Sequence, residues 1–555
     1  MPSFALPFAL ELALSVTTYL LLTLPWLNFF SAGPSPAVLP LLFSWICSLA
    51  LLGGGRAVWG RARAAAGGTW LAAALLSAGM GLLQYFGLGN YFSPWVSSTA
   101  AGEAYANLRQ RNQFATLTNI GLAALLWWAA RQPKVAELAP QGVPATITIT
   151  ETAATATATA TGMPAAPLAA PLFTPLFEPF PAAVRQVICA GAAALLAAGN
   201  AASSSRTGLV QLLLLLALAG LWGQWRRPAV RPLLWMAALA YALASATLPQ
   251  LAGLDASSTG ILARLHEGGL ACSSRLTLWR NVLHLISLKP WWGWGWGELD
   301  YAHFITLYPG ARFCEILDNA HNLPLHLAVE LGGPLALAVC GGGLWLVWRA
   351  KPWREGDATR QMAWSVLALI LLHSLLEYPL WYGPFQMACG LCIGLLGWRP
   401  KVPNGVHINA GYENSGSNRP LASVLYTLVA ILLIVFSTYA AWDYRRVSQI
   451  YLPPQERSPA YRSNTLEKIQ GTWLFQSQAR FAELTLTPLT LENAQHINQL
   501  AHGLLHFSPE ARVVEKLIDS ARLLGRDDEV QYYATRYRAA YPDEHDRWAQ
   551  KNGVR

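Results

Sequence analysis

Residues 318–333, DNAHNLPLHLAVELGG, combine groups that can do chemistry with an apolar run that reads as a helix. The polar members of the stretch are Asp318, Asn319, His321, Asn322, His326 and Glu330. A histidine takes up and releases protons near neutral pH, so this stretch holds possible proton acceptors. The spacing argues against zinc, because only His326 and Glu330 share a helical face and no cysteine cluster assists. We expect no metal here.

Further polar residues stand where other apolar runs begin or end. They are Gln110, Arg111 and Asn112 in NLRQRNQF, Arg206 in SSSRTG, Arg275 in CSSRLTLWRN and Glu377 in HSLLEYPLWY. Charge within a membrane domain is costly, so ionisable residues at the ends of spans suggest a functional site. Each also has a structural interpretation: Arg206 and Arg275 would reach lipid headgroups, and His321 would cap a helix. The tryptophans of PWWGWGWG, 290–297, suit either membrane-interface anchors or a platform for sugar or lipid.

The composition indicates that a membrane positions these residues. The chain has 555 residues, of which 54% are hydrophobic and 12% are charged, and one soluble core cannot bury that much apolar surface. We predict an all-α polytopic membrane protein. About eleven transmembrane helices are expected, near 7–30, 36–54, 68–88, 114–130, 183–200, 207–224, 231–250, 322–348, 362–380, 382–398 and 421–443.

Basic loops set the orientation. Four of them fall on one side if every span crosses, at 56–63, 225–231, 348–355 and 398–401. The positive-inside rule makes that side cytoplasmic, and it explains the net charge of +9 without nucleic acid as a partner. Alternation then exports residues 88–113, the SSSR turn, the large loop 251–321 and everything after 443. The residues that come together on this exported side are Gln110, Arg111, Asn112, Arg206, Arg275, His321 and Glu377.

Two domains and one linker follow from the pattern. Residues 1–443 form the transmembrane domain, and 444–555 form a charged, soluble, helical domain in the periplasm. The pair 510–526 and 527–542 resembles a tetratricopeptide (TPR) unit, which suits either a protein-docking surface or a helical cap. The Ala/Thr- and Pro-rich segment within 131–182 reads as a flexible cytoplasmic linker. Cys272 and Cys314 share the exported loop, where an oxidising compartment would permit a disulfide.

The motifs together resemble a family. HNLPLHLAVELG, the exported arginine of SSSRTG and RLTLWRNVLHLISLKPWWGWGWG are similar to the signature of the O-antigen ligase and polymerase superfamily. QRNQFAT and HSLLEYPLWYGPF resemble its protein-directed branch, the PglL-type O-oligosaccharyltransferases. The resemblance covers about residues 75–400, and the linker is a departure from it.

The resemblance implies transfer of a preassembled glycan from undecaprenyl diphosphate to a Ser or Thr hydroxyl of a periplasmic acceptor protein such as pilin. The enzyme would be a multi-pass protein among the lipids of a bacterial inner membrane, with its active site facing the periplasm. His321 would be catalytic, and Arg206, Arg275 and Arg111 would bind the diphosphate. Supporting or acceptor-binding roles would fall to Glu377, Gln110, Asn112 and Asn322. No cofactor is implied.

Three alternatives remain open at this point. An O-antigen ligase would use the same donor but attach it to lipid A–core, and an O-antigen polymerase would extend the glycan. A transporter, from a different functional class, would place charged residues near the middles of its spans and break paired helices. Here the charges crowd at the outer ends of the spans, apart from Glu11.

Overall fold

The computed structural model describes residues 5–28, 37–131, 181–255, 257–266, 271–397 and 419–553. Every regular element in these ranges is a helix, which confirms the all-α prediction. The predicted linker at 131–182 lies almost wholly outside the described residues.

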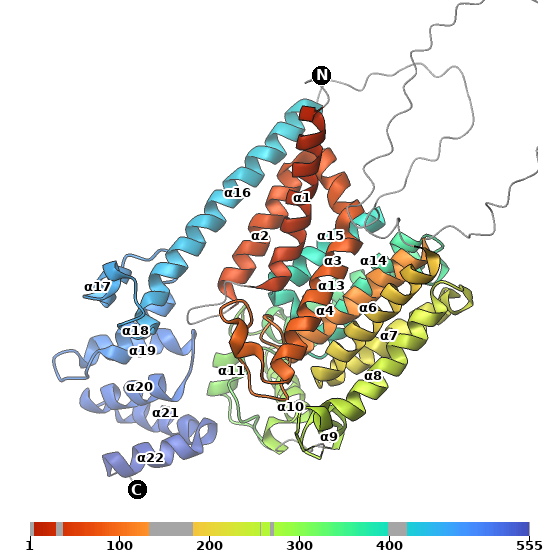
Figure 1. Cartoon of the computed structure of the whole chain (residues 1–555). Coiled ribbons are helices and arrows are strands. Elements are labelled where there is room, and N and C mark those ends of the chain that lie inside the picture. Colours follow the sequence, from red (N-terminus) through yellow and green to blue (C-terminus); the bar gives the residue numbers. More distant parts are fainter. Residues whose placement is uncertain are drawn as a thin grey trace, which may run out of the picture.

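Long helices form a bundle (Figure 1). They are α1 (Ala5–Leu27), α2 (Val38–Gly53), α3 (Gly55–Tyr85), α4 (Arg111–Ala130), α6 (Ala182–Ala202), α7 (Arg206–Leu221), α8 (Arg231–Leu251), α13 (Gly333–Ala350), α14 (Ala358–Ser374), α15 (Gly383–Gly397) and α16 (Arg419–Ser448). Six stretches among the described helices are long and apolar enough to cross a membrane: Leu10–Leu27, Val58–Tyr85, Ala182–Ala202, Arg231–Leu251, Gly333–Arg354 and Val424–Tyr451. The protein is therefore a multi-pass membrane protein, and the total of eleven spans stays a prediction.

Small residues let the central helices approach closely. A Cβ added at Gly121 of α4 would collide with Ala74 of α3, and one added at Gly199 of α6 would lie 3.0 Å from Ala78. Such small-residue contacts are typical of helix packing in membranes, where lipid provides no hydrophobic drive for association. They bring α3, α4 and α6 together, and α4 carries Arg111 and Asn112 at its N-terminal end.

Short helices gather at one end of the bundle (Figure 1). They are α9 (Gly260–His266), α10 (Arg275–Leu288), α11 (Leu299–Ile305) and α12 (Leu323–Leu331). The stretch 322–348 was predicted as one span, and this was wrong at its start. The helix breaks at Gly332, where φ is +87° and no helix can continue, so α12 stands apart from α13.

The remaining single-turn 3₁₀ helices lie in the connections. They are η1 (Gly89–Phe92), η3 (Gln224–Arg226), η4 (Ala271–Ser273), η5 (Pro352–Arg354), η6 (Pro379–Trp381), η7 (Gln449–Tyr451) and η8 (Pro459–Tyr461). Of these, η6 matters most for the site, because it directly follows the turn that holds Glu377.

The C-terminal residues form a separate helical layer at the same end of the bundle (Figure 1). Its helices are α17 (Thr465–Ile469), α18 (Gln476–Leu486), α19 (Ala494–Leu505), α20 (Ala511–Leu523), α21 (Asp527–Ala540) and α22 (Pro542–Asn552). The predicted helical pair coincides with α20 and α21, whereas its kinship to TPR repeats stays a prediction.

Two contacts hold this layer in place. At 30 residues α16 is about 45 Å long, more than a bilayer core requires, so its end projects toward the layer. Buried Asp443 near that end accepts hydrogen bonds from the Thr472 hydroxyl and the Leu474 amide, at 2.8 and 3.1 Å. On the other side Phe304 of α11 packs in the same apolar cluster as α19–α22, and Arg536 donates to the Ile305 carbonyl at 2.8 Å.

Candidate active site

The carboxylate of Glu377 is the centre of a polar cluster at the end of the bundle where the short helices gather. His321 Nδ1 lies 2.6 Å from Oε2 of Glu377, and Arg275 forms an ion pair with Oε1. Gln110 Nε2 and Asn112 Nδ2 also donate to the carboxylate, at 3.4 and 3.3 Å. Four separate segments of the chain therefore meet at one side chain that is only 9% exposed.

The turn after α14 aims Glu377 into this cluster. Helix α14 ends at Ser374, and the Glu377 amide still donates to the His373 carbonyl at 2.8 Å, which closes the last turn. Asn322 fixes the turn from outside, because its Nδ2 donates to the Leu375 carbonyl at 3.0 Å. The same side chain caps α12 by accepting from the Leu325 amide at 3.1 Å. Asn322 thus connects the segment of His321 to the segment of Glu377.

His321 is held in an unusual backbone conformation. Its φ is +49°, a left-handed value that residues other than glycine adopt rarely. Its amide donates to Oδ1 of Asn319 at 2.9 Å, which stabilises the bend. The imidazole meets the ring of Tyr378 edge-on, with centroids 5.0 Å apart. Backbone and ring are therefore both fixed, as a positioned proton acceptor requires.

The electrostatics keep Glu377 ionised. Burial alone would raise the pKa of its carboxyl group, but the hydrogen bond and charge of His321 and the charge of Arg275 outweigh burial, and the pKa is lowered. An ionised carboxylate can only accept hydrogen bonds, so Nδ1 of His321 carries the proton of the shared bond. In the neutral imidazole, the second ring nitrogen, Nε2, then carries the free lone pair.

The start of α7 is tied to the cluster through Asn112. Ser205 caps α7 by accepting from the Gly208 amide at 2.9 Å, and its hydroxyl donates to Oδ1 of Asn112 at 2.6 Å. Arg206, the first residue of α7, donates to the carbonyl of Arg264 in α9. Arg264 in turn approaches the Ser204 carbonyl at 3.5 Å. The structure therefore brings Arg206 to the same end of the bundle as Arg275.

Arg111 stands apart from Glu377. It forms an ion pair with Glu103, in the segment that precedes α4. The neighbouring residues Gln110 and Asn112 reach the carboxylate, whereas Arg111 has a carboxylate partner of its own. Its role toward a phosphate stays a prediction.

A disulfide braces the loop that carries two members of the cluster. Cys272 and Cys314 are bonded, 42 positions apart in sequence and with their Cα atoms 5.4 Å apart. Cys272 lies three residues before Arg275, and Cys314 lies on the segment that leads to His321. Closing a loop of this length restricts the unfolded chain and is worth about 4 kcal/mol.

His326 and Glu330 form their own buried pair on α12. Their Nε2 and Oε2 atoms lie 3.4 Å apart, and both side chains are nearly inaccessible. The tryptophan-rich segment after α10 clamps this helix: the Trp294 amide donates to the Val329 carbonyl at 2.9 Å, and the Gly295 amide donates to the Glu330 carbonyl at 3.0 Å. This main-chain clamp supports α12, and through α12 it supports the position of His321.

Three residues of the surroundings were not predicted. Arg264 sits in an unremarkable stretch, ILARLH, and only the fold brings it to Arg206. Ser205 stands directly before an apolar run, and a serine at that position is a common helix N-cap, so its role in capping α7 could have been predicted. His373, fully buried below Glu377, lies 2.9 Å from the Thr116 hydroxyl on α4, and a histidine inside a span could have been noticed.

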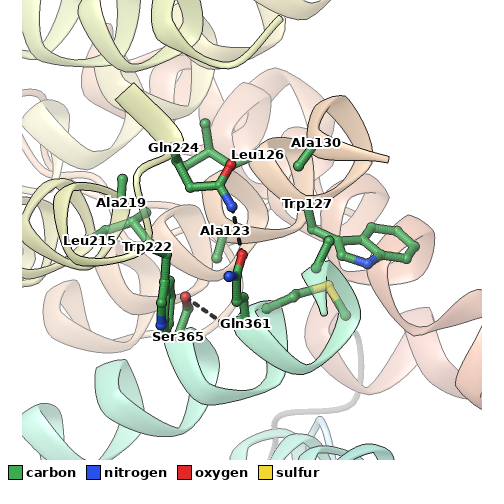
Figure 2. A pocket seen from close by; sticks show the side chains of 12 residues that line it. Ala123, Leu126, Trp127, Ala130, Leu215, Ala219, Trp222, Gln224, Gln361 and Ser365 are labelled. Carbon is green, nitrogen blue, oxygen red and sulfur yellow. Dashed lines mark hydrogen bonds between the residues drawn. The ribbon is translucent and has the colours of Figure 1, made fainter. Parts of the chain in front are cut away.

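A cavity lies at the other end of the bundle, away from the cluster (Figure 2). Its volume is about 350 Å³, including space that is open to solvent, and it lies between the ends of α4, α7 and α14. Gln224 donates to Gln361 at 2.6 Å inside it, and Ser365 donates to the Gln361 carbonyl at 2.9 Å. None of its lining residues belongs to the Glu377 cluster.

Three consecutive parts of the chain match known protein families. Residues 104–129 match a family described as protein glycosylation ligase, residues 191–340 match O-antigen ligase, and residues 361–553 match the C-terminal part of a virulence factor membrane-bound polymerase. Each match contains part of the cluster: Asn112 lies in the first, His321 in the second and Glu377 in the third.

Two curated proteins of Acinetobacter baylyi are similar to this chain. A general O-oligosaccharyltransferase is 27% identical over 153 residues, which is 25% of this chain and 26% of that protein. A ComP-specific O-oligosaccharyltransferase is 27% identical over 124 residues, or 22% of each. The matched region thus spans about a quarter of the length of these relatives. No solved structure matches the chain. By these matches and by the order of its motifs, the chain is similar to the O-antigen ligase and polymerase superfamily and, within it, to the PglL-type proteins.

Proposed function

We propose that this protein transfers a preassembled oligosaccharide from undecaprenyl diphosphate to a Ser or Thr hydroxyl of an exported acceptor protein, such as a pilin. The observation that carries the proposal is the contact of His321 with Glu377, whose carboxylate is also paired with Arg275. A fixed histidine backed by a carboxylate, beside an arginine, supplies a base for a hydroxyl and a cation for a phosphate leaving group.

In the reaction, the acceptor oxygen attacks the anomeric carbon of the sugar that is attached to the diphosphate. The new bond joins that carbon to the acceptor oxygen, and the bond from the carbon to the phosphate oxygen breaks. The hydroxyl proton passes to Nε2 of His321, and undecaprenyl diphosphate leaves with the electron pair. His321 is thus the catalytic residue.

Glu377 acts through His321 as a positioning residue. By accepting the Nδ1 proton it fixes the imidazole tautomer in which Nε2 can take a proton, and its charge stabilises the imidazolium that forms. Gln110, directly before α4, and Asn112 in its first turn hold the carboxylate, and Asn322 holds the turn.

The leaving diphosphate needs cations, and arginines of three helices reach this end of the bundle. Arg275 is 41% exposed and uses one of its donors for Glu377, so its other donors can bind phosphate oxygens. Arg206 and Arg264 lie side by side at the start of α7. We assign the diphosphate to these three side chains.

The donor and acceptor place the protein in a bacterial inner membrane with the cluster on the periplasmic side. A periplasm-dependent reporter fused after residue 460 should be active, and the same reporter within the basic loop 225–231 should be silent. The reverse pattern would contradict the orientation.

Reconstitution tests the acceptor class. The purified full chain is incubated with undecaprenyl-diphosphate oligosaccharide and either an exported Ser/Thr-rich protein or lipid A–core. We expect glycan on the protein alone. If glycan appeared on lipid A–core alone, the chain would be an O-antigen ligase. The match of residues 191–340 to the O-antigen ligase family is consistent with this alternative. Lengthening of the lipid-linked glycan itself would make the chain a polymerase.

A further inference from the structure

Two tryptophans from distant segments stack beside the cluster. The rings of Trp296 and Trp381 are nearly parallel, with an interplanar angle of 11° and centroids 6.0 Å apart. Trp296 is 62% exposed, whereas Trp381 is half-buried behind it. The pair therefore presents one open indole face on a rigid backing ring.

The stack is fixed close to His321. Trp381 belongs to η6, three residues after Tyr378, whose ring contacts His321. Both indoles also meet the edge of His326, with centroids 5.0 Å away for Trp381 and 6.1 Å for Trp296. His326 lies on α12, the helix that starts directly after His321 and Asn322. One short helix and one 3₁₀ turn therefore connect the aromatic stack to the proposed base.

The main-chain clamp on α12 keeps Trp296 in place. Hydrogen bonds of the Trp294 and Gly295 amides to α12 end just before Trp296. A Cβ at Gly293 would collide with the backbone of Glu330, so the segment can approach this closely only as glycine. Main chain on one side and a stacked ring on the other hold the open face, so little side-chain conformational freedom would be lost when a ligand binds.

The neighbouring tryptophans behave differently. Trp291 and Trp292 belong to the same segment and are 70% and 88% exposed, and among the described residues neither has a stacked partner of the kind that Trp296 has. Exposed indoles of this kind suit the boundary between lipid and water. Trp296 is set apart by its backing ring and by its contact with the helix that follows His321.

We propose that Trp296, backed by Trp381, is a subsite for a pyranose ring of the donor glycan beyond the sugar that is joined to the diphosphate. A pyranose carries a flat face of C–H bonds that matches an indole face, and the indole edge adds one N–H donor. An extended peptide would need main-chain partners that one indole face does not offer. The inference rests on the proposed function and adds a determinant of donor length.

Transfer assays with two donors test the subsite. One donor is undecaprenyl diphosphate carrying a single N-acetylhexosamine, and the other carries a trisaccharide. For Trp296→Ala we expect kcat/KM with the trisaccharide donor to fall about tenfold, while kcat/KM with the one-sugar donor stays within about twofold. Trp296→Phe should retain most of the trisaccharide preference, and Trp292→Ala, the matched control, should leave it unchanged. Equal losses with both donors, or a raised KM for acceptor protein alone, would overturn the subsite.

A binding measurement separates failure of the subsite from failure of the proposed function. The free trisaccharide is titrated into the full chain in detergent and followed by saturation-transfer NMR. An NMR signal on the sugar C–H protons that is present with wild type and lost with Trp296→Ala supports the subsite. This holds even if wild type transfers no glycan to an acceptor and the proposed function is wrong. The subsite would be overturned if Trp296→Ala still bound the trisaccharide. If wild type also transferred glycan to the acceptor protein, the proposed function would remain.

Discussion

His321 and Glu377 are 56 residues apart in sequence, yet Nδ1 of the histidine lies 2.6 Å from Oε2 of the carboxylate. This contact joins the turn after α14 to the start of α12, and it orients a ring that can take a proton from a hydroxyl. The cluster around it defines which substitutions should affect chemistry and which should affect folding.

Glu377→Gln should keep the shape of the site while removing its charge. An amide can present its N–H to Nδ1 of His321 and so select the wrong tautomer, so we expect kcat to fall by about 10²–10⁴-fold with little change in protein level. Initial rates of glycan transfer measure this. Glu483→Gln, in the C-terminal layer, is the matched control, and a rate for Glu377→Gln equal to that of the control would refute the positioning role.

The same carboxylate should make stability depend on pH. Because the pKa of Glu377 is lowered in the folded protein, its ionised form stabilises the fold above the ordinary value of 4.5. That stabilisation is lost as the pH falls through the lower folded value. The difference in Tm between wild type and Glu377→Gln should therefore be constant above about pH 5.5 and shrink in more acidic buffer. A difference that grows on acidification would reverse the assigned direction.

Arginine substitutions should weaken use of the lipid-linked donor. Arg206→Ala, Arg264→Ala and Arg275→Ala should each lower kcat/KM for donor by about tenfold to a hundredfold. Arg275→Lys should restore only part of the loss, because an ammonium group lacks the planar fork. Arg280→Ala provides the control, since Arg280 lies on the same helix as Arg275 and is exposed. If Arg280→Ala lowered kcat/KM for donor as much as the other substitutions, the loss would reflect the overall positive charge of the surface and not a diphosphate site.

Gly332→Ala should destabilise the support of His321. The residue has φ +87°, and an added Cβ would collide with the Trp291 carbonyl. We expect a loss of more than about 1 kcal/mol, seen as a lower Tm of the detergent-solubilised protein. Gly341→Ala on α13 is the comparison, because no atom in the described part of the chain lies within 4 Å of its added Cβ. A Tm for Gly332→Ala as high as that of Gly341→Ala would show that the clamp on α12 is not needed.

The sequence predicted much of this arrangement because hydrophobicity and charge act locally. The apolar runs located the long helices, and the basic loops placed His321, Arg206 and Glu377 on one side. Helix α12 escaped prediction because its apolar pattern runs on into α13. The break at Gly332 depends on the contact of that glycine with the Trp291 carbonyl, which no local pattern reveals.

The pairings within the site could not be predicted, because they join distant segments. Arg275 and Glu377 are 102 residues apart, and several carboxylates were equally available to that arginine from sequence. Arg264 reaches Arg206 only because α9 folds back over the start of α7. The packing of Phe304 against α19–α22 likewise depends on the projection of α16 toward that layer.

The most direct test of the account is the intact mass of an exported Ser/Thr acceptor protein after incubation with undecaprenyl-diphosphate oligosaccharide and either wild type or His321→Ala. His496→Ala, at an exposed histidine of the C-terminal layer, is the matched control. We predict that wild type and His496→Ala add the mass of one glycan, while His321→Ala, present at the same level, leaves the acceptor unmodified. Full glycan addition by His321→Ala would contradict the central claim that this histidine accepts the acceptor's proton.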